Sequence, residues 1–196
     1  HEHLLDARAV HQVERRLRGV GRPPRSTAEM AEWLRRLGDV TPGELEGPMA
    51  GFLEELASEG RARLIELPRC DASQRWVLAE EREVYEQAFG LVEATPEQQQ
   101  EAGSIVLDRF LQTHALVSLP DVLGRYPFES AWAERQLRLW AESGRAVSVP
   151  PVADVETVRF SAPENLEQVQ RNSLGLLRRE VVTCSAPQLV DFVLRW

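Results

Sequence analysis

Lysine is absent from this 196-residue chain, so all 23 basic residues are arginine. Cysteine is almost absent too: Cys70 and Cys184 occur alone, and neither belongs to a CxxC motif. This scarcity argues against a disulfide framework and a zinc site, and it favours a reduced, cytoplasmic setting. No apolar run approaches the roughly 18 residues that a membrane span requires. We therefore expect no membrane partner.

Motifs of catalysis are also missing. Neither a GxxxxGK[ST] phosphate-binding loop nor an acidic DExx metal motif occurs. No carboxylate is spaced with a histidine, serine or cysteine in a pattern typical of acid–base or nucleophilic chemistry. The four histidines lack metal-ligand spacing. The sequence thus predicts no catalytic residue, no metal ion and no cofactor in this segment. Because the chain lacks an initiator methionine and stops inside a predicted helix, we expect it to be part of a longer protein.

The formal net charge of −8 is unevenly spread. The formal net charge is +3 in residues 1–36, −10 in residues 37–104 and −1 in residues 105–196. A protein that grips DNA across its whole face is basic, so we expect any nucleic-acid contact to be local. Arginine forks suit phosphates and base edges, but the composition of a GC-rich genome explains the absence of lysine more simply.

An internal repeat is the most informative pattern that is present. Residues 53–62 and 137–146 both read as an amphipathic helix that ends at a glycine followed by Arg-Ala. The offset of 84 also aligns Arg75-Trp76 with Arg159-Phe160. In both copies the helix is followed by two short strands across a turn, which is the second half of a winged helix.

The predicted fold class is mainly α with small β wings (α+β), built as two tandem winged-helix domains plus a C-terminal helical extension. The predicted domains are a first winged helix at 1–93, a second at 94–163, and a helical extension or the start of a further unit at 164–196. Hydrophobic periodicity and turn residues predict helices and strands within them. The expected helices cover 4–17, 26–37, 48–59, 80–89, 105–116, 119–126, 130–143, 163–179 and 186–196. The expected strands cover 61–67, 75–78, 145–149 and 158–160, and residues 94–103, which include Thr95-Pro96 and three glutamines, are expected to form a linker.

Two regions are candidate nucleic-acid-binding sites. The third helix of a winged helix usually enters the major groove, and in the second copy this helix offers Arg135, Gln136 and Arg138. Arginine and glutamine can form bidentate pairs with guanine and adenine. The alternative is a solvated face with intrahelical ion pairs, such as Arg138 with Glu142. The same helix of the first copy is expected to repel phosphates, because it exposes Glu54, Glu55, Ser58 and Glu59.

The second candidate is an arginine cluster near the N-terminus. Its members are Arg15, Arg16, Arg18, Arg22 and Arg25. They could contact a phosphate backbone, or they could simply be the solvated end of a helix, where cations suit the helix dipole.

Several segments resemble one family of proteins. They are residues 4–14, 36–42, 75–81, 113–114, 144–145, 171–181 and 192–196, of which Arg-Asn-Ser-Leu-Gly-Leu-Leu-Arg-Arg-Glu-Val at 171–181 is the most specific. Together they are similar to the region that follows the helicase core in the Lhr (large helicase-related) family of bacterial superfamily 2 helicases. The patches are short and scattered, but they extend over nearly the whole chain.

This resemblance implies a piece of a large ATP-dependent DNA-repair helicase that tracks on single-stranded DNA. The segment would be a non-catalytic part of a tandem winged-helix C-terminal region, with ATP and magnesium bound in motor domains elsewhere. Its implied partners are single-stranded or duplex DNA, the other domains of the parent and further copies in a homo-oligomer. The alternative is part of a uracil-DNA-glycosylase-like region whose catalytic residues lie outside this segment. The residues leave open whether this segment belongs to an enzymatic unit.

Overall fold

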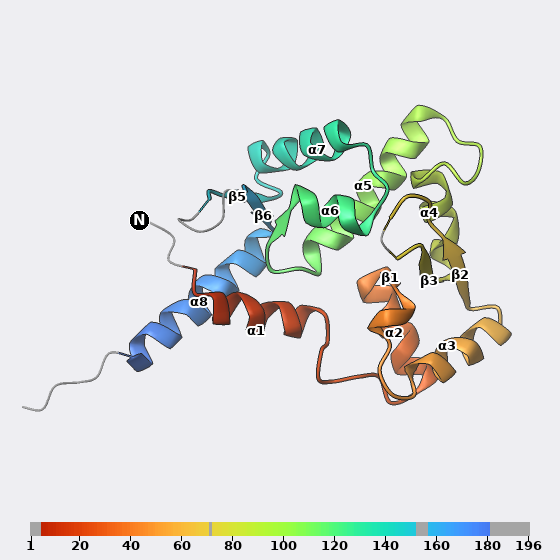
Figure 1. Ribbon diagram of the computed structural model, residues 1–196, viewed down its shortest axis with the longest axis horizontal. Coiled ribbons are helices and arrows are strands. Elements are labelled where there is room, and N and C mark those ends of the chain that lie inside the picture. Colours follow the sequence, from red (N-terminus) through yellow and green to blue (C-terminus); the bar gives the residue numbers. More distant parts are fainter. Residues whose placement is uncertain (1–4, 71, 152–156, 181–196) are drawn as a thin grey trace, which may run out of the picture.

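Helices dominate the chain, and two small sheets lie among them (Figure 1). The computed structural model describes residues 5–70, 72–151 and 157–180. Within these residues, no helix is long and apolar enough to cross a bilayer. The predicted class of helices with small sheets is confirmed. The helix expected at 186–196 lies outside the described residues.

A first unit combines three helices with a three-stranded antiparallel sheet. Its elements are α2 (Thr27–Leu37), β1 (Asp39–Val40), the 3-10 helix η1 (Pro42–Glu44), α3 (Met49–Ser58), β2 (Ala62–Glu66) and β3 (Gln74–Leu78). As its sequence predicts, Ser26 caps α2, because its side chain accepts a hydrogen bond of 3.2 Å from the backbone N–H of Glu29. The strand order is β1-β3-β2. In the central strand, Trp76 lies opposite Val40 on one side and Leu64 on the other.

The core of the first unit lies between α2, α3 and the sheet. Its buried apolar residues are Met30, Ala31, Leu34, Leu37, Val40, Met49, Leu53, Leu56, Ala62 and Leu78. Met30, Leu34 and Leu37 follow the helical period and therefore share one face of α2. Fully burying side chains of this size stabilises the fold by about 1.5–3 kcal/mol each.

A second unit repeats this arrangement later in the chain. Its elements are α5 (Pro96–Gln112), β4 (Val117–Ser118), α6 (Leu119–Arg125), α7 (Ser130–Glu142), β5 (Val147–Val149) and β6 (Arg159–Ser161). The strand order is β4-β6-β5, which matches that of the first sheet. Phe160 lies opposite Val117 and Ser148 in the central strand. The offset of 84 pairs Phe160 with Trp76, so the aligned residues occupy the central strands of both sheets.

The linker predicted at 94–103 is wrong, because α5 already begins at Pro96. Thr95 and Gln98 form a capping box: the Thr95 hydroxyl accepts from the Gln98 N–H at 3.2 Å, and the Gln98 side chain accepts from the Thr95 N–H at 2.9 Å. Proline at the first helical position is also favourable. Thr95 and Pro96, which predict a turn by their residue type, therefore begin a helix instead. The resulting long α5 packs along α4 (Arg82–Ala88). Its Arg109 also forms an ion pair of 2.8 Å with Glu81 of the 3-10 helix η2 (Ala79–Glu81).

The first helix, α1 (Ala7–Leu17), packs on α8 (Pro163–Glu180), although the predicted domains place them in different units. Ala9 and Val13 of α1 are buried against Ala115 and Val169. The contact joins the two ends of the described chain. The proposed domain boundaries themselves stay predictions.

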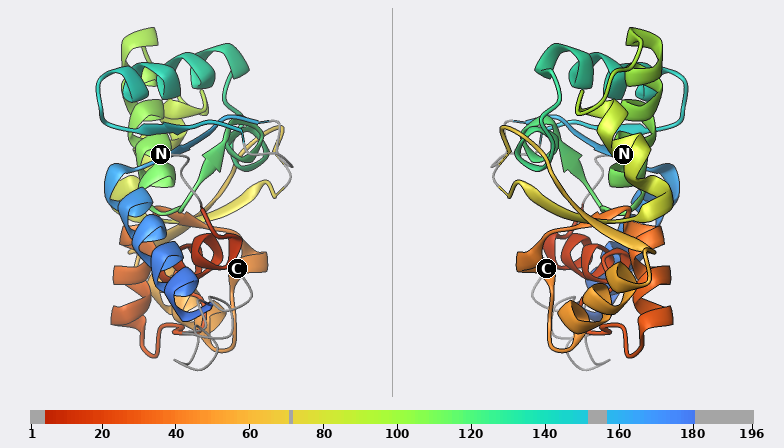
Figure 2. Two further views of the ribbon diagram at one scale, coloured as in Figure 1. Left: turned by 90° about the vertical axis from the view of Figure 1, so that its left-hand side faces the viewer. Right: turned by 90° about the vertical axis from the view of Figure 1, so that its right-hand side faces the viewer.

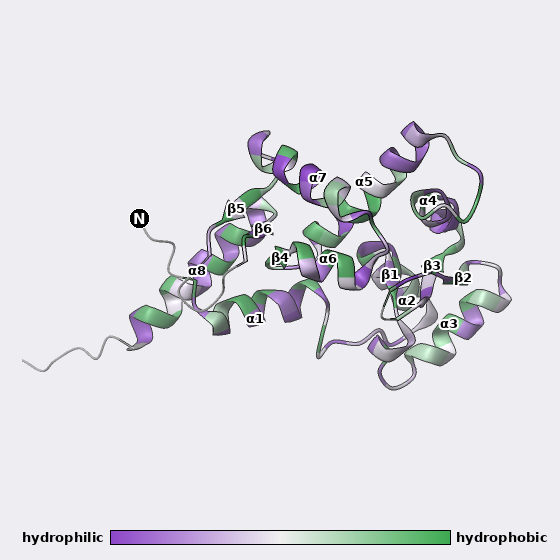
Figure 3. Ribbon diagram, turned by 45° about the horizontal axis from the view of Figure 1, so that its top comes forward, coloured by the Kyte–Doolittle hydropathy of each residue, from purple (hydrophilic) through white to green (hydrophobic). Residues whose placement is uncertain are grey.

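The two units occupy opposite ends of the molecule. Figure 2 shows α5 and α7, drawn in green and teal, toward one end, and α2 and α3, drawn in orange, toward the other. Hydrophilic and hydrophobic residues alternate along the helices (Figure 3), as amphipathic helices require.

Candidate nucleic-acid interface

The exposed face of α7 carries the first predicted site. Ala133, Leu137 and Trp140 are buried on one side of this helix. The opposite side is lined by Arg135 and Arg138, which are both exposed, and it forms a shallow hollow of about 500 Å³. Gln136 is only half exposed and does not line this hollow. The structure therefore brings the two arginines to one face and sets the glutamine apart from it.

Arg138 is held by an ion pair along the helix. Its Nη2 lies 2.6 Å from Oε1 of Glu134, and both side chains are well exposed, at 69% and 46%. The predicted partner, Glu142, lies one turn further on and is not the partner observed, because the guanidinium turns toward the N-terminal end of α7. An exposed pair of this kind contributes at most about 1 kcal/mol, so a phosphate can displace it. Within the described residues, Arg135 has no ion-pair partner and is the more available of the two.

The corresponding helix of the first unit is acidic, as its sequence predicts. Glu54, Glu55 and Glu59 of α3 are all exposed. Of these, Glu55 accepts a hydrogen bond from the hydroxyl of Thr27. This face repels a phosphate backbone, so the two structurally matching helices present opposite surfaces.

The predicted arginine cluster divides in two. Arg15 and Arg16 are exposed on α1, and Arg22 and Arg25 are exposed in the loop that follows. Arg18 turns inward instead: its side chain is 11% exposed and forms an ion pair with Glu44. Its surroundings therefore give Arg18 a structural role.

Folding adds one arginine to the cluster. The Arg36 guanidinium lies on the loop after α1, because a Cβ placed on Gly19 would meet its Nη2 at 3.0 Å. Gly19 and Gly21 have φ angles of +70° and +83°, which favour glycine and let the chain reverse at this point. Arg36 lies 11 residues from Arg25 in the sequence, on α2, so nothing in the local pattern indicated this neighbour.

A buried ionic junction, absent from the sequence predictions, connects the two units. Asp39 of β1 is fully buried and accepts a hydrogen bond of 2.7 Å from Nη2 of Arg125, at the end of α6. Arg75 of β3, which is 1% exposed, places Nε 3.3 Å from the same carboxylate oxygen. The hydroxyls of Tyr85 and Tyr126 donate to the other carboxylate oxygen, the former at 3.0 Å. We call these five residues the Asp39 junction.

Further contacts extend the Asp39 junction toward α1. Arg75 donates through Nη2 to the backbone carbonyl of Arg125 at 2.7 Å. Glu44 accepts from Nη1 of Arg125 at 3.0 Å and also pairs with Arg18. Burial opposes ionisation of Glu44, but the two guanidinium groups outweigh it and lower the pKa of this carboxyl. In both buried tyrosines, burial and the nearby charge of Asp39 raise the pKa of the phenol well above its usual range.

The described residues contain no cluster of three or more histidine, cysteine, aspartate or glutamate side chains that could hold a metal ion. Residues 152–156, which belong to the turn between the strands expected at 145–149 and 158–160, lie outside the described part of the chain. The candidate site is thus a set of exposed arginines on two surfaces, of which the one on α1 adjoins the Asp39 junction through Arg18 and Glu44. Exposed guanidinium groups of this kind can bind anions such as phosphates.

A helical group closed by a small antiparallel sheet, with a hairpin following the third helix, defines the winged-helix class of domain. A family model described as the winged-helix domain of the large helicase-related (Lhr) protein matches residues 3–102. The match covers about half of the chain, and the chain belongs to this family. None of the curated proteins matches it.

Proposed function

We propose that this chain is a non-catalytic tandem winged-helix segment of a large ATP-dependent DNA-repair helicase. Its role is to position nucleic acid and to hold neighbouring domains of the parent protein, or further copies of it, in place. Membership of the Lhr winged-helix family supports this proposal. So does the matching strand order of the two sheets. ATP and magnesium would bind in motor domains outside the segment, in the cytoplasm.

The observation that carries the proposal is the contrast between α7 and α3. Both occupy the third-helix position, which usually faces the major groove. α7 exposes Arg135 and Arg138, whereas α3 exposes Glu54, Glu55 and Glu59. Nucleic acid is therefore expected at the second unit, with the first unit acting as a scaffold. Gln136 is the third expected contact, and its side chain is half-buried.

The arginine cluster on α1 is a separate proposed contact. Figure 2 shows α1 and α7 well apart in the molecule, so the two arginine surfaces are separate. Four exposed arginines can each contact a phosphate: Arg15, Arg16, Arg22 and Arg25. Arg18 is mostly buried and forms an ion pair with Glu44 instead.

A charge reversal on α7 tests the proposal. Replacing Arg135→Glu and Arg138→Glu together should weaken binding of a fluorescent single-stranded oligonucleotide at least about tenfold at low salt, because two phosphate contacts are lost. The matched control is Arg171→Glu with Arg178→Glu on α8. Arg171 forms an ion pair with Glu167 at 2.6 Å and the same i,i+4 spacing as the pair on α7.

Circular dichroism would check that both double variants keep the helical content of the wild type. Equal affinity of the α7 variant and the wild type would contradict the proposed contact and move it to the cluster on α1. A loss that is as large in the α8 control would show that the effect is not specific to α7.

A further inference from the structure

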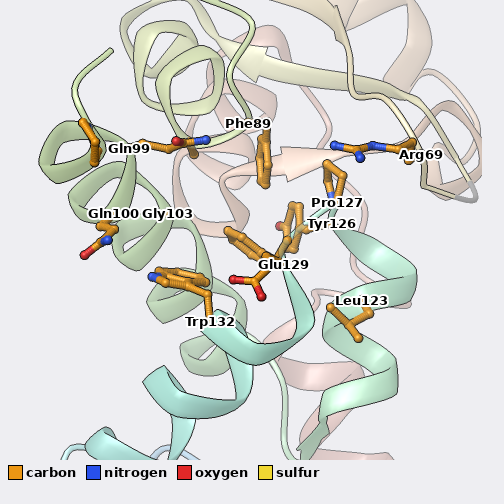
Figure 4. A pocket seen from close by; sticks show the side chains of 13 residues that line it. Arg69, Phe89, Gln99, Gln100, Gly103, Leu123, Tyr126, Pro127, Glu129 and Trp132 are labelled. Carbon is orange, nitrogen blue, oxygen red and sulfur yellow. The ribbon is translucent and has the colours of Figure 1, made fainter.

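A pocket of about 580 Å³ opens where the two units meet at the N-terminal end of α7. It is enclosed by the α4–α5 segment, the connection from α6 to α7 and the turn between β2 and β3 (Figure 4). Four aromatic side chains contribute to its wall: Phe89, Tyr126, Phe128 and Trp132. The proposed DNA-binding function does not use this pocket.

The rings form a continuous aromatic wall. The centroid of Phe128 lies 5.0 Å from that of Phe89 and 4.9 Å from that of Trp132. All three rings are half-buried, so each keeps part of its surface accessible. Gly103 leaves room for the indole, because a Cβ at this position would lie 3.1 Å from Cη2 of Trp132, which is tighter than an ordinary contact. A glycine in the middle of a helix costs about 1 kcal/mol, and here it lets the indole lie directly on α5.

One acidic and one basic side chain, Glu129 and Arg69, line different sides of the pocket. Glu129 precedes α7 and lies three residues before Trp132, so its carboxylate and the indole are neighbours. Within the described part of the chain, no ion pair or hydrogen bond engages the Glu129 carboxylate. Arg69 lines the pocket from the β2–β3 turn and lies across it from Trp132 in Figure 4. Its φ angle is +57°, the left-handed region that a non-glycine residue seldom adopts.

We propose that this pocket binds the guanidinium group of an arginine on a partner protein segment. Aromatic faces attract a guanidinium by cation–π interaction, and the adjacent Glu129 carboxylate supplies the matching charge. The charge of the surroundings also favours a cationic ligand. Residues 37–104 carry a formal net charge of −10, and Glu97 and Glu101 are exposed on α5 beside the pocket-lining glutamines. The same charge repels a nucleic-acid backbone. The partner is therefore a basic peptide rather than DNA.

The test uses two pentapeptides, acetyl-Gly-Ser-Arg-Ser-Gly-amide and the same peptide with citrulline in place of arginine. Citrulline keeps the shape of arginine but lacks its charge. Amide and indole NMR signals of the labelled protein report the site and the affinity. The arginine peptide should shift the indole N–H signal of Trp132, and it should bind about fivefold tighter than the citrulline peptide, as an exposed charge pair permits.

Two substitutions with opposite effects identify the occupant. Glu129→Gln should weaken binding of the arginine peptide about fivefold, whereas Arg69→Ala should tighten it, because a like charge is removed. The matched control is Glu97→Gln, which makes the same charge change outside the pocket wall and should alter affinity less than about twofold.

Equal affinity for the two peptides, or no shift of the Trp132 signal with either, would overturn the proposal. An oligothymidine that shifts the same signal, and binds tighter in Glu129→Gln and weaker in Arg69→Ala, would make the occupant a nucleobase instead. Failure of the α7 charge reversal to affect DNA binding leaves this result unchanged, so the two proposals fail separately.

Discussion

Replacing Asp39→Asn should destabilise the protein by about 3–5 kcal/mol, because it leaves the buried Arg75 guanidinium without a countercharge and Arg125 with Glu44 alone. Asp39 is fully buried, Arg75 is 1% exposed and the Arg125 side chain is 15% exposed. Water therefore cannot compensate for the missing carboxylate. A domain of this kind has a total stability of about 5–15 kcal/mol, so the variant should still fold at low temperature but should unfold at a much lower urea concentration.

The assay is urea unfolding followed by far-ultraviolet circular dichroism at 10 °C. The matched control is Asp108→Asn, since Asp108 also pairs with an arginine, Arg145 at 3.1 Å, but on the surface. That change should cost only about 0.2–1 kcal/mol. Tyr126→Phe removes a single hydroxyl from the junction and should cost about 1.5–3 kcal/mol, as a hydrogen bond to a charged group does. A loss in Asp39→Asn no larger than that of Asp108→Asn would refute the reasoning.

Two further predictions concern stability. Burial, aided by the positive charge of Arg18, lowers the pKa of His114 from 6.5 to about 4. The unfolded chain therefore takes up a proton first, and stability should fall as the pH drops from about 6.5 to about 4, by up to about 3 kcal/mol. Comparing urea midpoints at pH 7.5 and 5 should show a smaller difference in His114→Gln than in the wild type; an equal difference would mean that another group is responsible. Thr95→Ala removes the cap of α5 and should cost about 1 kcal/mol in the same assay at neutral pH, and an unchanged midpoint would contradict the capping role.

Local patterns predicted most of the helices and the longer strands. α2 and α3 could be found because their apolar residues recur every three or four positions and because Ser26 and Gly60 mark a cap and a stop. β1 and β4 were missed because a two-residue strand has no periodicity to detect. The start of α5 was missed because threonine and proline, which open this helix, are also turn residues.

The candidate site was less predictable than the fold. Exposure of Arg135 and Arg138 followed from the helical period of α7. The roles of Arg18 and Asp39 did not, because their partners lie 26 and 86 residues away in the sequence. Arg18 and Asp39 each lie next to a helix-ending glycine, a position that predicts a solvent-exposed side chain unless the distant partner is known. Long-range pairing of this kind leaves no local signal.

Binding of single-stranded DNA by this segment, measured as a function of salt concentration, tests the central proposal most directly. If Arg135 and Arg138 each neutralise one phosphate, the logarithm of the association constant should fall against the logarithm of salt with a slope of about −1.4 or steeper. Duplex DNA measured in parallel would show which form is preferred. A slope near zero, or no binding at low salt, would contradict DNA contact and leave the two units as a scaffold for neighbouring domains.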